Sequence, residues 1–271
     1  MALPAVFATS IAEEIPPDPT PAPALRAAVD RPQVAARTPR ADLAARVEAA
    51  ADFAAGRGGS IGFAIVSSRG EMRGRNEHDL FICASVVKSM LLAAELRRLD
   101  DGDLPLDPAT RSLLERMITL SDNDAATAIY ARVGDEGLYR VAKDAGMEDF
   151  QVQYSWGFAR ISAADMARMF SRLDRVMPER YLEYGRGLLG SIIPAQSWGI
   201  PAVAAPDGWS VRFKGGWLET DSGQLVSQAA ELRRDGRTLG MAVLTDGQSS
   251  MAAGIETVRG VASRLLAGEG T

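Results

Sequence analysis

Segments typical of β-strands lie near both ends of the sequence, and almost everything between them has helical periodicity. Residues 60–66, a turn at 67–70 and residues 71–76 predict a β-hairpin, because apolar and β-branched residues precede a turn-forming stretch. Three more strands are predicted at 210–214, 225–232 and 238–245. Helices are predicted at 42–55, 85–99, 107–117, 122–133, 136–144, 162–177, 179–192 and 251–266. This order favours an α/β fold of the α+β type, in which both chain ends build one mainly antiparallel sheet flanked by helices, and an all-helical subdomain is inserted between its halves.

The first 40 residues differ in composition from the rest of the chain. They hold eight of the 14 prolines and show no helical or strand period, which predicts a flexible tail. The opening has the small and apolar residues found at the end of a signal peptide, but not its basic start. An ordinary terminus and the remnant of an export signal both remain open, and the second implies a periplasmic or secreted protein. Residues 41–271 are expected to form one domain, with 41–78 and 207–271 in the sheet subdomain and 79–206 in the helical insert.

The composition of the 271-residue chain excludes several classes of protein. Its net charge is −5 and it has no run of basic residues, so we expect no nucleic acid partner. A single cysteine, Cys83, and a single histidine, His78, exclude an intramolecular disulfide and a zinc site built from several cysteines or histidines. No stretch of about 20 apolar residues occurs, so no membrane span is predicted. We expect a monomer that needs no metal or cofactor.

Lysine is unusually rare in this sequence. Of the 30 basic residues only Lys88, Lys143 and Lys214 are lysines. A chain so biased toward arginine keeps lysine where arginine cannot replace it, namely where a group must give up its proton near neutral pH or present a compact charge. Lys143 is interpreted as a solvated helix residue, so attention falls on Lys88 and Lys214.

The first motif is Ser85-Val86-Val87-Lys88, at the start of a predicted helix. A serine and a lysine three positions apart share one helix face, so the amine can reach the hydroxyl. Free backbone N–H groups at a helix start favour a developing oxyanion. The simpler interpretation is a helix-capping serine followed by a lysine whose charge stays in solvent.

Two further motifs follow in the chain. Ser121, Asp122 and Asn123 stand just before a predicted helix, where Asp122 or Ser121 could simply cap it, or where Ser121 and Asn123 could offer a hydroxyl and an amide to a substrate. The last motif, 214–217, has the sequence Lys-Gly-Gly-Trp at the end of a predicted strand. Two glycines there allow a ligand to approach closely, although a β-turn with a surface lysine would look the same.

Taken in order, Ser-x-x-Lys, Ser-Asp-Asn and Lys-x-Gly resemble the motif set of the penicillin-recognising serine hydrolases, the class A β-lactamases and penicillin-binding proteins. The resemblance runs from about residue 41 to the C-terminus and implies the β-lactamase/transpeptidase-like fold. It also implies the catalytic roles. Ser85 would be the acylated nucleophile and Lys88 its general base, Ser121 would protonate the leaving nitrogen, and Lys214 would orient Ser121 and anchor a carboxylate. The backbone N–H groups of Ser85 and Trp217 would form the oxyanion hole.

The resemblance also implies a substrate-binding set, made up of Asn123, Gly215, Gly216 and Trp217. Two departures affect it. The family usually has Thr or Ser at the position of Gly215, and its hydroxyl contacts the substrate carboxylate, so carboxylate recognition is expected to be weaker here. The segment 85–121 is also short for a class A enzyme, which predicts a wider cleft.

A third departure concerns the second half of the reaction. Class A β-lactamases carry a Glu on an Ω-loop, ahead of the helix that here begins near residue 162, and this Glu activates the deacylating water. Between 146 and 161 the only acids are Glu148 and Asp149, immediately after the start of the segment. Deacylation is therefore expected to be slow.

The resulting hypothesis is a serine-acylating hydrolase that opens a β-lactam or a related amide or ester. Two alternatives remain: a D,D-peptidase or esterase of the same superfamily that acts on cell-wall peptides or small esters, and a protein that binds β-lactams or peptidoglycan fragments without hydrolysing them. Four tryptophans, Trp156, Trp198, Trp209 and Trp217, fall in the second half of the chain, where they either line an aromatic pocket or pack in the core or at an interface.

Overall fold

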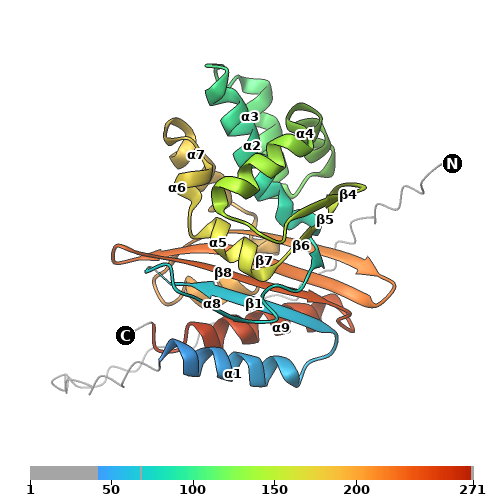
Figure 1. Cartoon of the computed structure of the whole chain (residues 1–271), viewed down its shortest axis with the longest axis vertical. Coiled ribbons are helices and arrows are strands. Elements are labelled where there is room, and N and C mark those ends of the chain that lie inside the picture. The colour runs from blue at the N-terminus through green and yellow to red at the C-terminus, as the bar shows by residue number, and fades with distance from the viewer. Residues whose placement is uncertain (1–41, 68, 270–271) are drawn as a thin grey trace, which may run out of the picture. The chain divides into compact units, whose positions relative to one another are not determined.

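Five antiparallel strands form the central sheet in the computed structural model, which describes residues 42–67 and 69–269. In spatial order they are β2 (Met72–Arg75), β1 (Ser60–Val66), β8 (Arg237–Asp246), β7 (Gly223–Arg234) and β6 (Ser210–Thr220). The predicted hairpin is confirmed, with Val66 opposite Met72. Strands from both ends of the chain therefore lie side by side, and β6 is one edge of the sheet (Figure 1).

Helices cover both faces of this sheet. α1 (Leu43–Ala55) and α9 (Met251–Leu265) pack together on one face, where α8 (Ile200–Ala204) contacts α9, β6 and β7. α5 (Ala163–Phe170) lies on the other face, across β8 and β1. It packs so closely that a Cβ atom on Gly240 of β8 would lie 1.9 Å from the Ala167 carbonyl oxygen of α5. The predicted mainly antiparallel sheet with flanking helices is thus confirmed.

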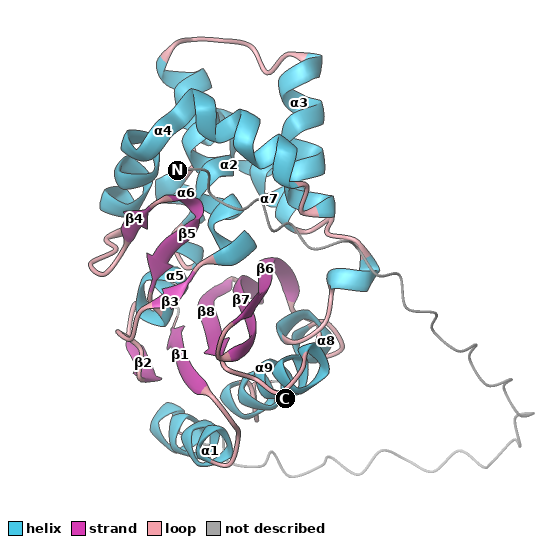
Figure 2. Cartoon of the chain, turned by 90° about the vertical axis from the view of Figure 1, so that its right-hand side faces the viewer, coloured by secondary structure: helices cyan, strands magenta, loops and turns pink. Residues whose placement is uncertain are grey.

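In the inserted segment α2 (Lys88–Asp101) packs against two other helices, α4 (Asn123–Ala145) and α7 (Glu179–Leu189), which are labelled in Figure 2. Ten residues of α2 are buried, among them Met90, Leu91 and Leu92. The other helical elements of the insert are η1 (Ala84–Val87), α3 (Pro108–Glu115), η2 (Arg116–Leu120), α6 (Leu173–Val176) and η3 (Pro194–Gln196). α4 bends at Gly134, whose φ of 58° lies outside the helical region. This bend explains why the sequence pattern predicted two shorter helices there.

The insert is not entirely helical, which corrects the expectation of an all-helical subdomain. β3 (Phe81–Ile82), β5 (Ser155–Ile161) and β4 (Gln151–Gln153) form a second, three-stranded sheet in that order. Two of these strands have only two or three residues, too few to show an alternating pattern in the sequence. The expected bounds of the insert, 79–206, also include α5 and α8, although these two helices pack on the main sheet.

The predicted N-terminal tail and signal remnant fall on residues 1–40, outside the described residues. Among the helices of the described part, none is both long and apolar enough to cross a membrane.

Candidate active site

Ser85 lies in the single 3₁₀ turn of η1, directly before α2, and is partly exposed. The chain ahead of it is anchored to β5, because the Cys83 backbone N–H donates to the Ala159 carbonyl (2.8 Å) and the Cys83 thiol donates to the Trp156 carbonyl (3.1 Å). Ala84, between Cys83 and Ser85, has a φ of 42°, in the left-handed region that a non-glycine residue rarely adopts. Ser85 is therefore held at a strained, well-anchored corner of the chain.

Lys88 is completely buried, and its ammonium group points to the segment before α4. Its Nζ donates to the Ser121 carbonyl, to Ser121 Oγ (3.2 Å) and to Asn123 Oδ1 (2.7 Å). The Trp156 ring lies 5.3 Å from the same nitrogen. No hydrogen bond joins Lys88 to the Ser85 hydroxyl in the described structure. The two residues of the first motif are therefore close in the chain, but their side chains are not hydrogen-bonded to each other.

Ser121 joins the second motif to the third. It follows the π-helical turn η2 and has a φ of 61°, which turns its side chain toward the two motif lysines. Its Oγ lies 3.2 Å from Lys88 Nζ and 3.2 Å from Lys214 Nζ. Asp122 performs the capping role, since it accepts a hydrogen bond from the Ala125 N–H (2.9 Å) at the start of α4. Asp122 thus caps α4, while its neighbour Ser121 contacts the two lysines. We refer to Lys88, Ser121 and Lys214 as the lysine–serine network.

The third motif lies in the middle of β6, not at a strand end as the sequence suggested, because β6 continues through both glycines to Thr220. Lys214 is completely buried and also donates to the Gly215 carbonyl (2.9 Å). Gly216 is required by close packing. A Cβ atom there would lie 2.8 Å from the Ser85 nitrogen and 2.9 Å from the Val86 nitrogen, both backbone atoms. The absence of a side chain at Gly216 therefore lets β6 lie against η1.

The Trp217 backbone points to the free edge of β6. Trp217 pairs with Val226 on β7, and the N–H and C=O of Val226 both engage the Thr245 hydroxyl on β8. Because the N–H and C=O of one strand residue point to the same side, the Trp217–Val226 pair is not hydrogen-bonded, and the Trp217 N–H faces away from β7. A Cβ atom on Gly216, next to Trp217, would lie 2.8 Å from the Ser85 nitrogen, so the two backbone N–H groups expected to bind an oxyanion lie on adjoining segments.

Burial changes the protonation of both lysines. It lowers the pKa of Lys88 to about 7, against the opposing charge of Asp122. Burial also lowers the pKa of Lys214, and the nearby charge of Lys88 lowers it further. A lysine with a pKa near 7 is a neutral amine in a large fraction of molecules at physiological pH and can accept a proton. The network can therefore move protons at the place where Ser85 and the β6 edge meet.

The two acids that precede β5 are engaged elsewhere. The Glu148 carboxylate lies 3.4 Å from Arg168, and the Asp149 carboxylate lies 2.8 Å from His78 Nδ1. This contact raises the pKa of His78. Over residues 42–67 and 69–269, no carboxylate hydrogen-bonds to the lysine–serine network, and no cluster of three or more His, Cys, Asp or Glu residues could hold a metal ion.

Sequence reasoning left the tryptophans undecided, and they divide into two groups. Trp156 (8% exposed) and Trp209 (3% exposed) are buried. Trp198 and Trp217 instead face each other edge to face beside β6, with ring centroids 6.2 Å apart and planes at 68°. Trp198 was not among the expected binding residues, because only the fold brings the segment after η3 against β6.

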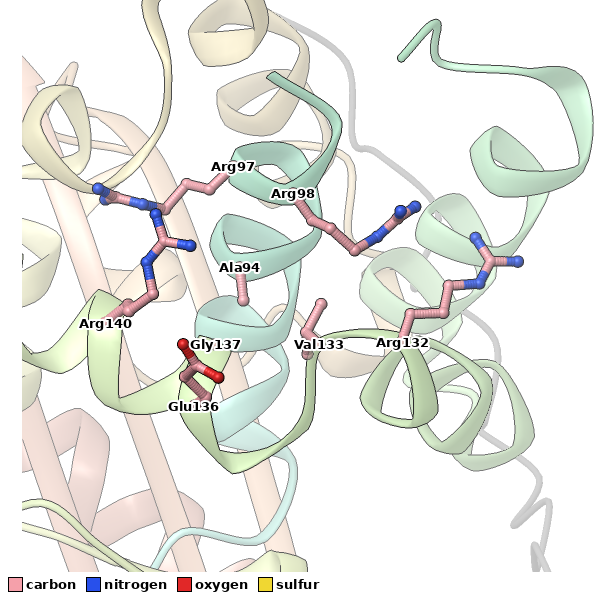
Figure 3. Close-up of a pocket in the computed structure, with 8 residues that line it drawn as sticks. All are labelled: Ala94, Arg97, Arg98, Arg132, Val133, Glu136, Gly137 and Arg140. Carbon is pink, nitrogen blue, oxygen red and sulfur yellow. The ribbon is translucent and has the colours of Figure 1, made fainter. Parts of the chain in front are cut away.

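A cavity of about 160 Å³ lies between α2 and α4 and is lined by none of the residues above. Its lining residues are Ala94, Arg97, Arg98, Arg132, Val133, Glu136, Gly137 and Arg140. Figure 3 shows the four arginines as two pairs on opposite sides of it. Every one of them is already paired with an acid, as Arg97–Asp144, Arg98–Glu95, Arg132–Glu95 and Arg140–Asp101. The charge in this cavity is thus compensated, and the chemistry is concentrated at the lysine–serine network.

Comparison with known proteins agrees with this fold. The family model described as the β-lactamase enzyme family matches residues 106–268, which contain Ser121 and Lys214 but begin after Ser85 and Lys88. A β-lactamase structure from Sphaerobacter thermophilus aligns with a TM-score of 0.71 and 21% identity over 83% of this chain and 97% of that one. A β-lactamase structure from Chitinophaga pinensis aligns with a TM-score of 0.72 and 17% identity over 82% of this chain and 97% of that one. The structure of an ancestral class A β-lactamase (GNCA) aligns with a TM-score of 0.69 and 21% identity over 82% of this chain and 98% of that one. No curated protein matches the sequence at a significant level.

Proposed function

The chain belongs to the β-lactamase enzyme family, and on this basis we propose that it is a serine-acylating hydrolase of the class A β-lactamase type, with Ser85 as the nucleophile. The observation that carries the proposal is the position of one hydroxyl, Ser121 Oγ, 3.2 Å from the Nζ atoms of two buried lysines, one of which follows Ser85 by three residues. Two buried amines that share a hydroxyl are costly to maintain, and a proton-transfer site explains why they are kept. The substrate is a small molecule, and we also propose an extracytoplasmic location, as is usual in this family.

In the proposed reaction Ser85 Oγ attacks the carbonyl carbon of an amide or ester, and its proton passes to the neutral amine of Lys88. Lys88 reaches Ser85 by a rotamer change, since the two residues are close on one helical face. The oxyanion is stabilised by the N–H groups of Ser85 and Trp217. Ser121 then donates a proton to the leaving group and recovers one from Lys88, while Lys214 orients Ser121. The product is an acyl-enzyme on Ser85.

Acylation is expected to become faster as the pH rises through 7. Below the pKa of about 7, Lys88 is an ammonium ion and cannot accept the Ser85 proton, whereas above it the free amine can. Stopped-flow acylation rates between about pH 5.5 and pH 9 should therefore follow a single ionisation near 7 and level off on the alkaline side. A rate that is constant over this range would contradict the role of Lys88 as the general base.

Acylation by β-lactams is expected to be faster than deacylation. The described residues supply a candidate for each acylation role, but no carboxylate reaches the lysine–serine network to activate a water. A missing positioned base costs about 3–5 kcal/mol of barrier if it is worth ~10²–10⁴ in rate. Mixing the protein with a chromogenic cephalosporin should give a burst of one equivalent and then a slow steady state, with the acyl-enzyme visible by intact-protein mass spectrometry.

The same experiment distinguishes the alternatives. A burst with an adduct that never decays would identify a protein that binds β-lactams without hydrolysing them. Linear, rapid turnover with no adduct would contradict the prediction of slow deacylation, and Glu148→Gln and Asp149→Asn would then test whether either acid supplies the base. No adduct with any β-lactam, together with rapid hydrolysis of simple esters, would favour an esterase. Gly215, which has no hydroxyl for a substrate carboxylate, gives this second candidate specific support.

A further inference from the structure

We infer that Trp198 and Trp217 form the binding surface for the leaving group of the substrate, and that this surface selects an uncharged aryl group over a carboxylate. The inference rests on the proposed function and specifies the substrate class.

The Trp198 ring occupies the space beside Gly215. A Cβ atom on Gly215 would lie 3.5 Å from both Cη2 and Cζ2 of Trp198, at van der Waals contact. A threonine or serine there would bring its side chain against indole carbons, which cannot accept or donate a hydrogen bond. Position 215 of β6 therefore has no polar side chain, and the edge of the Trp198 ring fills the space beside it.

The backbone, and not the ring, fixes the position of Trp198. Gln228 on β7 is completely buried, and its amide donates to the Trp198 carbonyl (2.8 Å) and accepts from the Ile200 N–H (2.8 Å). Gly199 between them has a φ of 66°, and a Cβ atom on it would lie 2.4 Å from Gln228 Oε1. This clamp holds the segment independently of the indole, so the ring can be removed without releasing the loop.

The aromatic pair lies at the leaving-group end of the site. Lys214 Nζ donates both to the Gly215 carbonyl (2.9 Å) and to Ser121 Oγ (3.2 Å), and Ser121 is the proposed proton donor to the leaving group. Gly215 is thus the β6 residue next to that donor. Trp217, two residues on and 38% exposed, extends the same side of the strand, because residues 215 and 217 point to one face. Lys214 reaches Ser121 from the opposite face of β6, and the Gly215 carbonyl, which accepts from the same Lys214 amine, joins the two faces at the free edge of the strand. A leaving group bound at this edge can contact both Ser121 and the Trp198–Trp217 surface.

The charges at this end do not favour a carboxylate. Lys214 is completely buried and its amine is already held by Gly215 and Ser121. Within the described ranges, no arginine hydrogen-bonds to Gly215 or stacks on Trp198 or Trp217. A carboxylate would give up its hydration without gaining a free cation or a hydroxyl, whereas an aryl ring gains contact with two indole surfaces.

Two esters that differ only in charge test the inference: phenyl phenylacetate and its analogue with a carboxylate at the meta position of the phenol. The meta carboxylate barely changes the reactivity of the ester, so the ratio of kcat/KM values reports recognition. The wild type is expected to prefer the uncharged ester by about tenfold or more. Trp198→Ala should raise KM for that ester about tenfold with little change in kcat, and Trp198→Phe should restore most of the loss.

The double variant Trp198→Ala, Gly215→Thr is the strongest arm, since it removes the ring and adds the hydroxyl. It should shift the preference toward the carboxylate ester, whereas Gly215→Thr alone should not, because the ring remains in place. If the wild type prefers the carboxylate ester, or if Trp198→Ala and Trp217→Ala leave both KM values unchanged, the inference is wrong. Trp217→Ala decides the question if Trp198→Ala does not fold, because its side chain is partly exposed.

A binding measurement separates this inference from the proposed function. In Ser85→Ala, titration with each ester, followed by tryptophan fluorescence, gives affinity without turnover. Tighter binding of the uncharged ester, lost in Ser85→Ala with Trp198→Ala, supports the aromatic surface even if the wild type never acylates Ser85. Equal affinities for the two esters in Ser85→Ala would contradict the surface even if Ser85 is acylated.

Discussion

Replacing Ser85 by alanine is expected to abolish covalent labelling by a fluorescent penicillin and by a serine-directed phosphonate. Ser85 alone combines a position in η1, packing of its backbone nitrogen against Gly216, and a buried lysine three residues further on. Removing the nucleophile of a covalent mechanism should lower the labelling rate by 10³-fold or more, on the order of the losses seen when serine nucleophiles are deleted. Gel fluorescence and peptide mapping of the adduct measure this directly.

Ser112→Ala is the matched control, because Ser112 is exposed on α3 and forms no side-chain hydrogen bond in the described structure. Its labelling should equal that of the wild type. Label found on Ser121 or another residue, or undiminished labelling of Ser85→Ala, would show that the nucleophile has been assigned wrongly.

Lys88→Arg is expected to damage acylation nearly as much as Lys88→Ala, although it keeps the positive charge. An arginine cannot give up its proton at neutral pH, so the general base is lost in both variants, and such a base is typically worth ~10²–10⁴ in rate. Single-turnover acylation with a chromogenic cephalosporin measures the loss. The rise in rate near pH 7 should also vanish in both variants. A Lys88→Arg protein that keeps most of the wild-type rate would rule out proton transfer through this residue.

Lys88→Met separates this chemical effect from a general disturbance of the fold, since methionine fills similar space without a charge. The folded pKa of Lys88 is about 7, against 10.5 for a free lysine, so the unfolded state binds more protons between these values. The wild type should therefore gain stability as the pH rises from 7 to 10.5, and below 7 it carries the full cost of the buried ammonium. Lys88→Met should be inactive, and its stability relative to the wild type should fall by up to about 5 kcal/mol between pH 7 and pH 10.5, because only the wild type gains stability over this range. A stability difference between the two proteins that does not change with pH would contradict the lowered pKa of Lys88.

Much of the fold follows from local sequence patterns. The β1–β2 hairpin, α1 and α9 were predictable because each has a clear apolar period and turn or glycine boundaries. β4 and β8 illustrate the limit. β8 has ten residues and could be predicted, whereas β4 has three and exists only because β5 pairs with it. The end of β6 was misplaced for a related reason, since two consecutive glycines look like a strand terminus until η1 is packed against them.

The candidate site shows the same division between local and tertiary information. The spacing of Ser85 and Lys88, and the rarity of lysine, point to the reactive groups without any structure. The orientation of Lys88 toward Ser121 depends on the left-handed conformation of Ser121, which its own sequence does not reveal. Trp198 could not be placed because the 16 residues 199–214 separate it from Gly215, and Gln228 on a third segment holds the two together.

The three lysines differ in exposure, so their reactivity toward an amine-reactive reagent indicates whether the domain is folded. Lys88 and Lys214 are completely buried, whereas Lys143, near the end of α4, is exposed. Among the lysines, an amine-reactive dye should therefore modify only Lys143 in the native protein, and should reach the other two only when the domain opens. The number of dye molecules per chain, read by mass spectrometry, would then count unfolded molecules in a mixture, and attachment through Lys143 would immobilise the protein in one orientation with its reactive groups untouched.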